Sequence, residues 1–360
     1  MSLAGGRFRG REQIGRLKDF SILLIFGIVI VALSLATPRF LTVTNLTNIL
    51  DQVALIGIIA MGMTMLLISR NFDLSVGGQV AFIGLVTVKI ANSHGLAAGI
   101  VAGLCTGLAC GLFNGFVVTT LRVNSLIATL GSGLIFSGLA FVLAGSSPIS
   151  PVDTSFQEFA IADFLGLPAP GWVFIVVAVI TGWLLHFTVG GREIYAVGEN
   201  PEAARYAGVR STRIHYFTFA YIGILCAVAS LLLVGQLNVA DPSAASTFPL
   251  DVIAATVLGG VSIAGGKGSV HMAVVGVFLI GMISNGFNLL NLDPNLYRVM
   301  TGSIIIAAVA FDGAVRQWLT TPGAVRVRAR DDEEEARTTL TPGPADGSTS
   351  SVRTLGGGSR

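Results

Sequence analysis

The residues that could carry chemistry are few in this 360-residue sequence, and they form no complete catalytic pattern. The stretch 265–269, Gly-Gly-Lys-Gly-Ser, comes nearest to a phosphate-binding loop. It lacks the leading glycine, because Val261 occupies that place, and Gly268 follows the lysine where serine or threonine is needed. The four histidines are scattered, without the carboxylates and the spacing of a metal centre. We therefore expect no catalytic site, no metal site and no cofactor on this chain.

Carboxylates lie at the ends of hydrophobic stretches rather than inside them. Asp73 and Asp251 each begin such a stretch, and Asp312 closes the last one. A carrier driven by protons or sodium usually needs ionisable groups near the middle of the membrane. Here the simpler interpretation is that these aspartates end or cap helices, although an ion site is the alternative. The sequence therefore predicts that energy for transport comes from another chain.

Uncharged polar side chains do occur inside the hydrophobic stretches, at Thr64, Gln79, Asn114, Asn285 and Asn288. An amide in lipid must face a neighbouring helix or a wet path, because an unpaired polar group is costly there. Hydrogen bonding between helices is one interpretation, and lining a route for a polar, uncharged solute is the other. On the second interpretation, the candidates for the translocation path or gate are Asp73, Ser75, Gln79, Asn114, Asn285 and Asn288.

The composition is that of a membrane protein. Hydrophobic residues make up 52% of the chain and charged residues 12%, against about a quarter charged in soluble domains. Several apolar runs approach or exceed the roughly 20 residues that a helix needs to cross a bilayer. Open sheets are excluded in lipid because their unpaired backbone groups are too costly. We predict an all-α, polytopic protein with a membrane domain over residues 20–315.

The apolar runs predict about ten transmembrane helices. The first covers residues 20–36, and a signal peptide is the alternative there; its length and the many later runs favour an uncleaved helix. The other runs lie near 50–69, 75–92, 97–120, 124–144, 171–189, 214–235, 251–264, 270–290 and 296–313. The runs at 75–92 and 251–264 are short for a crossing.

Basic residues predict the orientation. Alternate threading from a cytoplasmic segment at 1–19 places most arginines and lysines of the loops inside, and only Arg39, Arg298 and Lys89 outside. Both termini are then cytoplasmic. Residues 316–360 combine blocks of charge with low hydrophobicity and predict a disordered tail. Because the basic residues follow membrane loops, the net charge of +2 indicates no binding of nucleic acid.

Two polar segments, 146–171 and 236–249, fall on the outer side in this threading. They could form a docking rim for an extracytoplasmic partner, or they could be ordinary connecting loops. A faint internal similarity also links the stretches 68–77 and 263–270. Both follow an inward-going run with a polar turn and then Ser-Val, as a duplicated transporter half would.

The longest cytoplasmic insert, residues 190–215, predicts a short helix. Asn200 can cap its N-terminus, Pro201 suits the first helical position, and Glu202 complements the helix dipole. Gly208 can adopt the left-handed conformation that ends a helix. A helix of roughly seven residues is marginal alone. We therefore expect a partner protein to hold it.

A series of motifs appears in order along residues 20–315. They are Asp73-Leu74-Ser75-Val76-Gly77, Ala128-Thr129-Leu130-Gly131, Gly138-Leu139-Ala140, Pro148-Ile149-Ser150, Gly191-Arg192-Glu193-Ile194-Tyr195-Ala196-Val197-Gly198, Asn200-Pro201-Glu202-Ala203-Ala204-Arg205, Leu250-Asp251-Val252-Ile253-Ala254-Ala255, Val257-Leu258-Gly259-Gly260 and Gly265-Gly266-Lys267-Gly268-Ser269-Val270. Together they resemble the permease subunits of bacterial ABC importers for ribose and similar monosaccharides, a group that includes autoinducer-2 permeases. Two departures, Asn71-Phe72 and Pro249, leave the solute open.

This resemblance implies a multi-pass protein of the bacterial inner membrane that works with several partners. They are a second permease chain (in a homodimer or a heterodimer), a cytoplasmic ABC ATPase that binds ATP and Mg²⁺, an extracytoplasmic solute-binding protein and membrane lipid. The resemblance also implies that the short helix is the coupling helix of the ATPase contact. Its candidate residues are Asn200, Pro201, Glu202, Ala203, Ala204, Arg205 and Gly208.

The leading hypothesis is a permease subunit of an ATP-driven importer of a sugar-like polar solute. A stand-alone secondary carrier or channel is the alternative, and a receptor or scaffold is a third. The lack of charge inside the spans argues against an ion-coupled carrier. The capped insert and its motif argue against a scaffold. The solute could be a pentose, a hexose, autoinducer-2 or a nucleoside.

Overall fold

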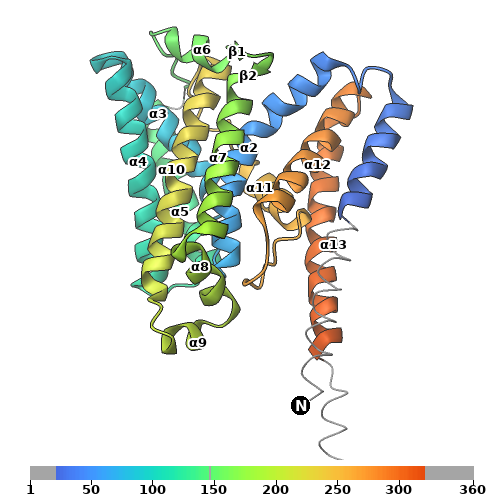
Figure 1. The fold of residues 1–360 in the computed structure, drawn as a ribbon. Coiled ribbons are helices and arrows are strands. Elements are labelled where there is room, and N and C mark those ends of the chain that lie inside the picture. The colour runs from blue at the N-terminus through green and yellow to red at the C-terminus, as the bar shows by residue number, and fades with distance from the viewer. Residues whose placement is uncertain (1–21, 146, 321–360) are drawn as a thin grey trace, which may run out of the picture. The chain divides into compact units, whose positions relative to one another are not determined.

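The structure is a computed structural model that describes residues 22–145 and 147–320 (Figure 1). Contacts divide the chain into one unit over residues 1–312 and another over 313–360. The predicted N-terminal segment 1–19 and residues 321–360 of the predicted tail lie outside the described residues. The seven helices that are long and apolar enough to cross a membrane all belong to the first unit.

Hydrophobic helices dominate the described residues. Seven of them are long and apolar enough to cross a membrane: α2 (Val43–Ile68), α3 (Val76–His94), α4 (Leu96–Thr119), α5 (Ser125–Ala144), α7 (Ala169–Phe187), α10 (Ser211–Leu237) and α12 (Val270–Leu289). Shorter apolar helices cover Ile22–Ala36 and α11 (Phe248–Leu258), and a further helix, α13, runs over Pro294–Thr320. The predicted all-α, polytopic architecture is confirmed.

The predicted span at 251–264 is wrong in its extent. α11 has only 11 residues, so it is about 16 Å long and cannot cross a bilayer alone. The chain then turns through Gly260, Gly265 and Gly266, which have φ angles of 80°, 83° and 72°. Glycine adopts these angles without the steric cost that other residues meet. The apolar run therefore holds a short helix followed by turns.

The polar insert contains two helices, α8 (Val189–Glu199) and α9 (Pro201–Tyr206). The prediction of a short capped helix is confirmed by α9, because the Asn200 side chain accepts hydrogen bonds from the N–H groups of Glu202 and Ala203, both at 3.1 Å. Gly208 follows with a φ angle of 87°. Helix α8 was not predicted, although its buried residues, Gly191, Ile194, Val197 and Gly198, recur at helical spacing.

The two segments predicted on the outer side meet in the structure. Ile149 and Ala240 form an isolated antiparallel bridge, with N–H to O distances of 3.0 and 2.8 Å. The first segment also contains α6 (Ser155–Ala160) and a hairpin of β1 (Asp163–Phe164) and β2 (Leu167–Pro168), in which Asp163 pairs with Pro168 and Phe164 with Leu167. Figure 1 shows α6 and this hairpin at one end of the bundle, the α6 end, and α9 at the other, the α9 end.

Helix α2 forms the centre of the hydrophobic core, and glycines bring α4 and α10 together beside it. From Val53 to Ile68 every residue except Ile56 is buried. A Cβ atom placed on Gly107 would clash with the carbonyl oxygen of Gly223, and one on Gly223 with that of Gly107. The two backbones are therefore in direct contact, which is how small residues allow membrane helices to pack closely.

We expect Gly223→Ala to lower the free energy of unfolding of the purified chain by about 1–3 kcal/mol, because the new methyl group must push α4 away from α10. The matched control is Gly131→Ala on α5, where no atom lies within 4 Å of an added Cβ. Its stability should be unchanged or slightly higher. Unfolding in mixed micelles of increasing denaturing detergent measures both, and equal stabilities would contradict the close contact.

Candidate functional site

The chain between α2 and α3, residues 69–75, enters the bundle without helical structure. The Phe72 N–H donates to the Ser125 hydroxyl at 3.3 Å, and the Leu74 N–H donates to the Thr129 hydroxyl at 3.0 Å. A Cβ on Gly133 would lie 3.1 Å from the Ser75 Cα, and Gly133 is roughly 12 Å along α5 from its start. Helix α3 therefore begins inside the bundle, and α5 supplies the acceptors that the segment needs.

Four of the predicted path residues form one buried group, the polar cluster of Asp73, Ser75, Gln79 and Asn114, each 0% exposed. Asp73 Oδ1 accepts hydrogen bonds from the Ser75 N–H, at 2.8 Å, and from the Ser75 hydroxyl. Its Oδ2 accepts from Gln79 Nε2 at 2.9 Å and Asn114 Nδ2 at 3.1 Å. Both amides also donate to the Ser75 hydroxyl, at 2.7 and 2.8 Å.

The polar cluster binds the 69–75 segment to α3 and α4 through uncharged donors. Such donors stabilise a buried carboxylate that would otherwise be costly. The amide oxygens of Gln79 and Asn114 are also buried and accept no hydrogen bond from the described residues. The arrangement supports the interpretation of these amides as links between helices. A part in the path or gate stays a prediction.

The remaining predicted path residues lie elsewhere. Asn285 on α12 exchanges amide hydrogen bonds with Asn45 on α2, at 3.0 and 2.9 Å. Asn288 is exposed near the end of α12. Thr64 donates to the Ala60 carbonyl within its own helix. The Asn285 amide thus joins two helices, and the six candidates do not form one site.

At the α9 end, Arg70 joins α8 to the segment that leads into the polar cluster. Its Nε donates to the Gly198 carbonyl at 2.6 Å, and its Nη2 donates to the Glu199 carbonyl at 2.8 Å. The Gly266 N–H donates to the Ile68 carbonyl at 2.8 Å. We call these five residues the α8 junction. It brings together the two stretches, 68–77 and 263–270, whose sequences are similar.

Packing at the α8 junction leaves no room for larger residues. A Cβ on Gly198 would clash with the Ile68 carbonyl oxygen. The Tyr195 hydroxyl donates to the Gly268 carbonyl at 2.8 Å, and burial raises the pKa of Tyr195, so this donor keeps its proton at neutral pH. Neither Arg70 nor Tyr195 was predicted as a site residue. The only signals were an arginine three residues before Asp73 and a tyrosine within a family motif.

Helix α9 buries one side chain and exposes the others. Ala204 is 5% exposed, whereas Glu202, Arg205 and Tyr206 are exposed. The Arg205 guanidinium lies 5.5 Å from the ring centroid of Tyr206, which is itself 82% exposed. Exposed arginine and tyrosine are typical of protein interfaces. Tyr206 was not among the predicted coupling residues, although it directly follows Arg205.

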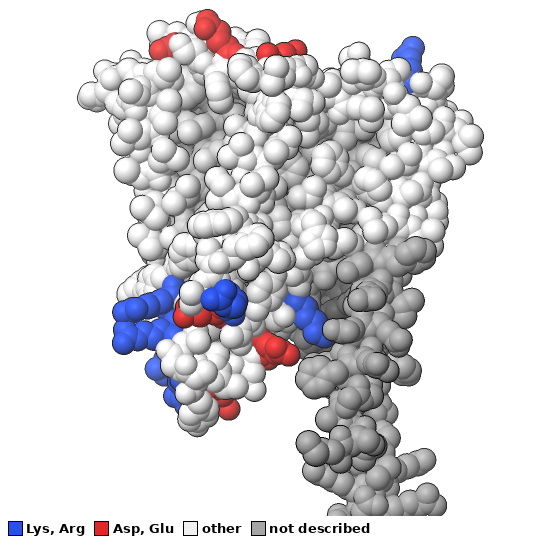
Figure 2. Space-filling view, viewed as in Figure 1, with Lys and Arg blue, Asp and Glu red and all other residues white. Residues whose placement is uncertain are grey.

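Charged side chains gather at the two ends of the bundle. Figure 2 shows Lys and Arg mainly around the α9 end, together with some acidic side chains. Asp and Glu occur at the α6 end, where little basic charge is seen. Between the two ends, the described part of the visible face is white, so no Lys, Arg, Asp or Glu is seen there. A band of this kind is what a surrounding bilayer requires.

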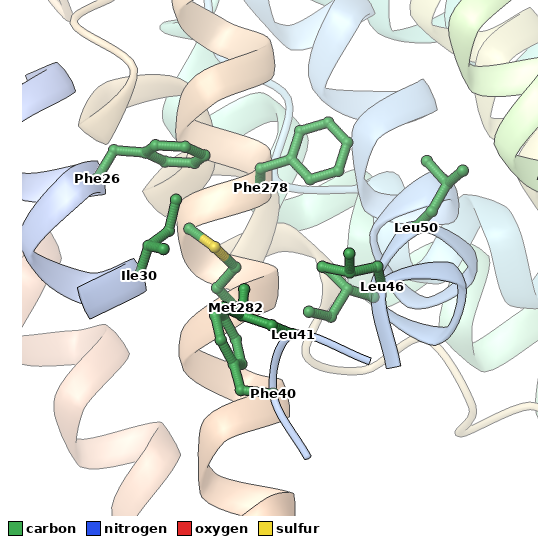
Figure 3. Close-up of a pocket in the computed structure, with 9 residues that line it drawn as sticks. Phe26, Ile30, Phe40, Leu41, Leu46, Leu50, Phe278 and Met282 are labelled. Atoms are coloured by element: carbon green, nitrogen blue, oxygen red, sulfur yellow. The ribbon is translucent and has the colours of Figure 1, made fainter. Parts of the chain in front are cut away.

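Two cavities differ in their chemistry. The first, of about 500 Å³ at the α6 end, is lined by Asp51, Asp163, Gln236, Asn48, Thr44, Thr47, Ala160, Ile161 and Pro168. Gln236 Nε2 donates to Asp51 Oδ1 there at 2.9 Å. The second, of about 300 Å³, lies between the helix Ile22–Ala36, α2 and α12 and has only apolar side chains, among them Phe26, Phe278 and Met282 (Figure 3). The second cavity offers no hydrogen bond to a polar solute.

The described residues combine seven helices long and apolar enough to cross a membrane with a buried polar cluster and an exposed capped helix, an arrangement that fits a membrane transport protein. Residues 45–309 match the family described as branched-chain amino acid transport system / permease component. The chain belongs to this family of permeases.

The curated relatives include permeases named for sugars. The L-arabinose transport system permease protein AraH of Escherichia coli K12 is 38% identical over 302 residues, which cover 83% of this chain and 92% of the relative. The ribose import permease protein RbsC of Bacillus subtilis 168 is 39% identical over 288 residues, 79% of this chain and 89% of the relative. The predicted resemblance to monosaccharide ABC permeases is confirmed. No solved structure matches the chain.

We expect Arg70→Ala to loosen the α8 junction, because two hydrogen bonds from a charged donor are lost and each contributes roughly 1.5–3 kcal/mol. Hydrogen exchange of the purified chain should accelerate at least about tenfold for peptides that contain Gly198 to Asn200 and Gly266. The control is Arg39→Ala, at an exposed arginine between the helix Ile22–Ala36 and α2. It should leave the exchange of these peptides unchanged. Unaltered exchange in Arg70→Ala would show that the junction does not hold α8.

Proposed function

We propose that this chain is the membrane subunit of an ATP-driven importer of a pentose-like sugar, and that it couples to a separate ABC ATPase. The observation that carries the proposal is identity of 38% and 39% with permeases named for L-arabinose and ribose, along nearly their whole length. The described residues add a capped, exposed helix without a nucleotide-binding loop of their own.

The interior chemistry supports an uncharged solute. The family description names branched-chain amino acids, whose ammonium and carboxylate groups need charged or strongly polar partners. The polar cluster instead presents amides and hydroxyls, and the carboxylate of Asp73 is already occupied by four donors. Hydroxyl groups of a sugar both donate and accept, so amides and hydroxyls suit them.

The α9 helix is the proposed contact with the ATPase, which would bind ATP and Mg²⁺ on its own chain. The exposed Glu202, Arg205 and Tyr206 would face that partner, and Asn200, Pro201, Ala203, Ala204 and Gly208 would maintain the helix. A helix of six residues is marginal without packing. An external surface that holds α9 would explain why its exposed side includes an aromatic side chain.

The α8 junction is the proposed route by which movement of α9 reaches the membrane. α8 is joined to α9 through Asn200, which ends one helix and caps the next. Arg70 connects the end of α8 to the 69–75 segment, and Asp73 connects that segment to α3 and α4. Displacement of α9 would therefore pull on the polar cluster through hydrogen-bonded neighbours. This is a contact route, and energetic coupling along it requires measurement.

Charge and exposed apolar side chains support the other proposed partners. Basic side chains around the α9 end agree with a cytoplasmic location of that end in a bacterial inner membrane. The α6 end would then face the solute-binding protein, with Phe159, Ile161, Phe164 and Leu165 exposed there. Exposed side chains of α4 and α5, including Leu112, Phe116, Leu134 and Val142, would contact lipid or a second permease chain.

The function is tested by reconstitution into liposomes together with the ATPase and the solute-binding protein that operate with this chain. We expect uptake of L-arabinose or D-ribose only with hydrolysable ATP, because the described residues supply no ion-coupling pair within the spans. A non-hydrolysable analogue is the control. Uptake by this chain alone, driven by a proton gradient, would contradict the proposal. Uptake of leucine, with no uptake of either pentose, would show that the solute is a branched-chain amino acid and not a sugar.

The ATPase contact is tested by reversing charge on α9. We expect the pair Glu202→Lys and Arg205→Glu to lower the amount of ATPase that co-purifies by about tenfold, since interface residues of this kind contribute more than 1 kcal/mol each. The stability of the chain itself should not change, because both side chains are exposed. Arg39→Glu in the other half of the bundle is the matched control. Full co-purification with both α9 charges reversed would place the contact elsewhere.

A further inference from the structure

A third cavity lies between α2, α11, α12 and α13, within the hydrophobic helices. It has a volume of about 230 Å³ and is lined by Gln52, Thr247, Phe248, Asp251, Ser284, Tyr297, Val53, Ile56, Val277, Ile280 and Gly281. We call it the α11 pocket. Its size is below the roughly 300–1,000 Å³ of pockets for drug-sized ligands. A solute that fills it is therefore small.

One wall of the α11 pocket is polar and held in place. The Tyr297 hydroxyl donates to Asp251 Oδ1 at 3.1 Å, and Asp251 is 6% exposed. Asp251 lies in the first turn of α11, where the helix dipole favours a negative charge. The Tyr297 ring meets Phe287 edge-on, with centroids 6.2 Å apart. The carboxylate and the phenol thus have fixed positions at the wall.

The rest of the lining of the α11 pocket is apolar. Val53, Ile56, Val277 and Ile280 contribute aliphatic surface there, and Phe248 contributes a ring. Gly281 allows α12 to lie close to α2, because a Cβ at that position would clash with the Val53 side chain. A pocket whose lining combines hydrogen-bonding groups with apolar side chains suits a ring that carries hydroxyls at its edge and C–H groups on its faces.

Gln52 lies where the α11 pocket approaches the polar end of α2. It is exposed and stands between the polar first turns of this membrane-length helix, with Thr47, Asn48 and Asp51, and the apolar run that begins at Val53. An amide exposed to hydrocarbon is costly, so polar residues of spanning helices face a protein neighbour or a wet path. Gln52 lines the α11 pocket, and the preceding residue, Asp51, lines the polar cavity at the α6 end.

We propose that the α11 pocket binds one monosaccharide ring during its passage, with Asp251 and Tyr297 bonding to hydroxyls, Phe248 covering an apolar face and the exposed Gln52 at the edge of the pocket. This inference rests on the proposed function and adds the place where the solute binds. The site includes a short helix between turns, because α11 has only 11 residues and stands between the non-helical segments 238–247 and 259–269. Interrupted helices place such sites within membrane transporters.

The start of α3 touches the start of α11, which connects the pocket to the polar cluster. A Cβ on Gly77 would lie 3.0 Å from Cδ of Pro249 and would also collide with the Ala245 carbonyl. Gly77 is two residues after Ser75 of the cluster. Movement of α3 would therefore displace Pro249, which lies two residues before Asp251.

The proposal is tested by protection of a cysteine. Cys105, the exposed native cysteine, is first replaced by Cys105→Ser. The variant Gln52→Cys is then made in this background, and its thiol is reacted with a small hydrophilic thiosulfonate in liposomes. We expect millimolar L-arabinose or D-ribose to slow this reaction at least about threefold. Asn48→Cys, on the same helix but in the polar cavity at the α6 end, is the control and should react equally with and without sugar.

A second set of variants keeps the test decisive. Adding Asp251→Asn or Tyr297→Phe to Gln52→Cys should remove the protection, and Asp251→Asn alone should lower ATP-driven uptake about tenfold. The wild-type transporter could take up a pentose while sugar fails to protect Gln52→Cys and Asp251→Asn shows normal uptake. That result would refute sugar binding in the α11 pocket and leave the proposed function intact. Failure of the wild-type transporter to take up either pentose would instead overturn the proposed function.

Discussion

A backbone group without a hydrogen-bond partner is costly in the interior of a membrane protein, and this constraint applies to two non-helical segments between the described helices, 69–75 and 259–269. At 69–75, hydroxyl groups of Ser125 and Thr129 accept the hydrogen bonds of the backbone. At 259–269, the Ser262 N–H donates to the Lys267 carbonyl, and the Gly266 N–H donates to Ile68 at the end of α2. Each interruption is tolerated because a neighbouring element supplies the partners.

These partners also connect parts of the chain that are distant in sequence. Arg70 uses its planar guanidinium to reach two carbonyls at the end of α8, which a lysine could not bind in the same fixed geometry. Asp73, three residues later, collects donors from α3 and α4. The exposed α9 helix is thus connected to the buried polar cluster by two sets of hydrogen bonds, at Arg70 and at Asp73, and by the short chain segments between them. That arrangement gives the proposed movement of α9 a physical means of reaching the membrane.

Glycines determine how closely the elements approach one another. Gly107 and Gly223 bring α4 and α10 into backbone contact, and Gly198 allows α8 to lie against the end of α2. Gly77 lets α3 touch the start of α11. The 45 glycines of the sequence predicted close packing in general. Which glycines make contact depends on the pairing of helices, and composition carries no information about that pairing.

The sequence by itself determined the all-α membrane class, most helix positions, the capped α9 helix and the kinship with sugar permeases, because hydrophobic runs and capping residues are local signals. It overextended the span at 251–264 because hydropathy does not detect a left-handed turn at Gly260. Only the tertiary structure decided that Asp73, Gln79 and Asn114 meet, that Asn285 pairs with Asn45, and that Arg70 reaches α8. These contacts join residues far apart in the chain, and helix packing, which has no local signature, sets them.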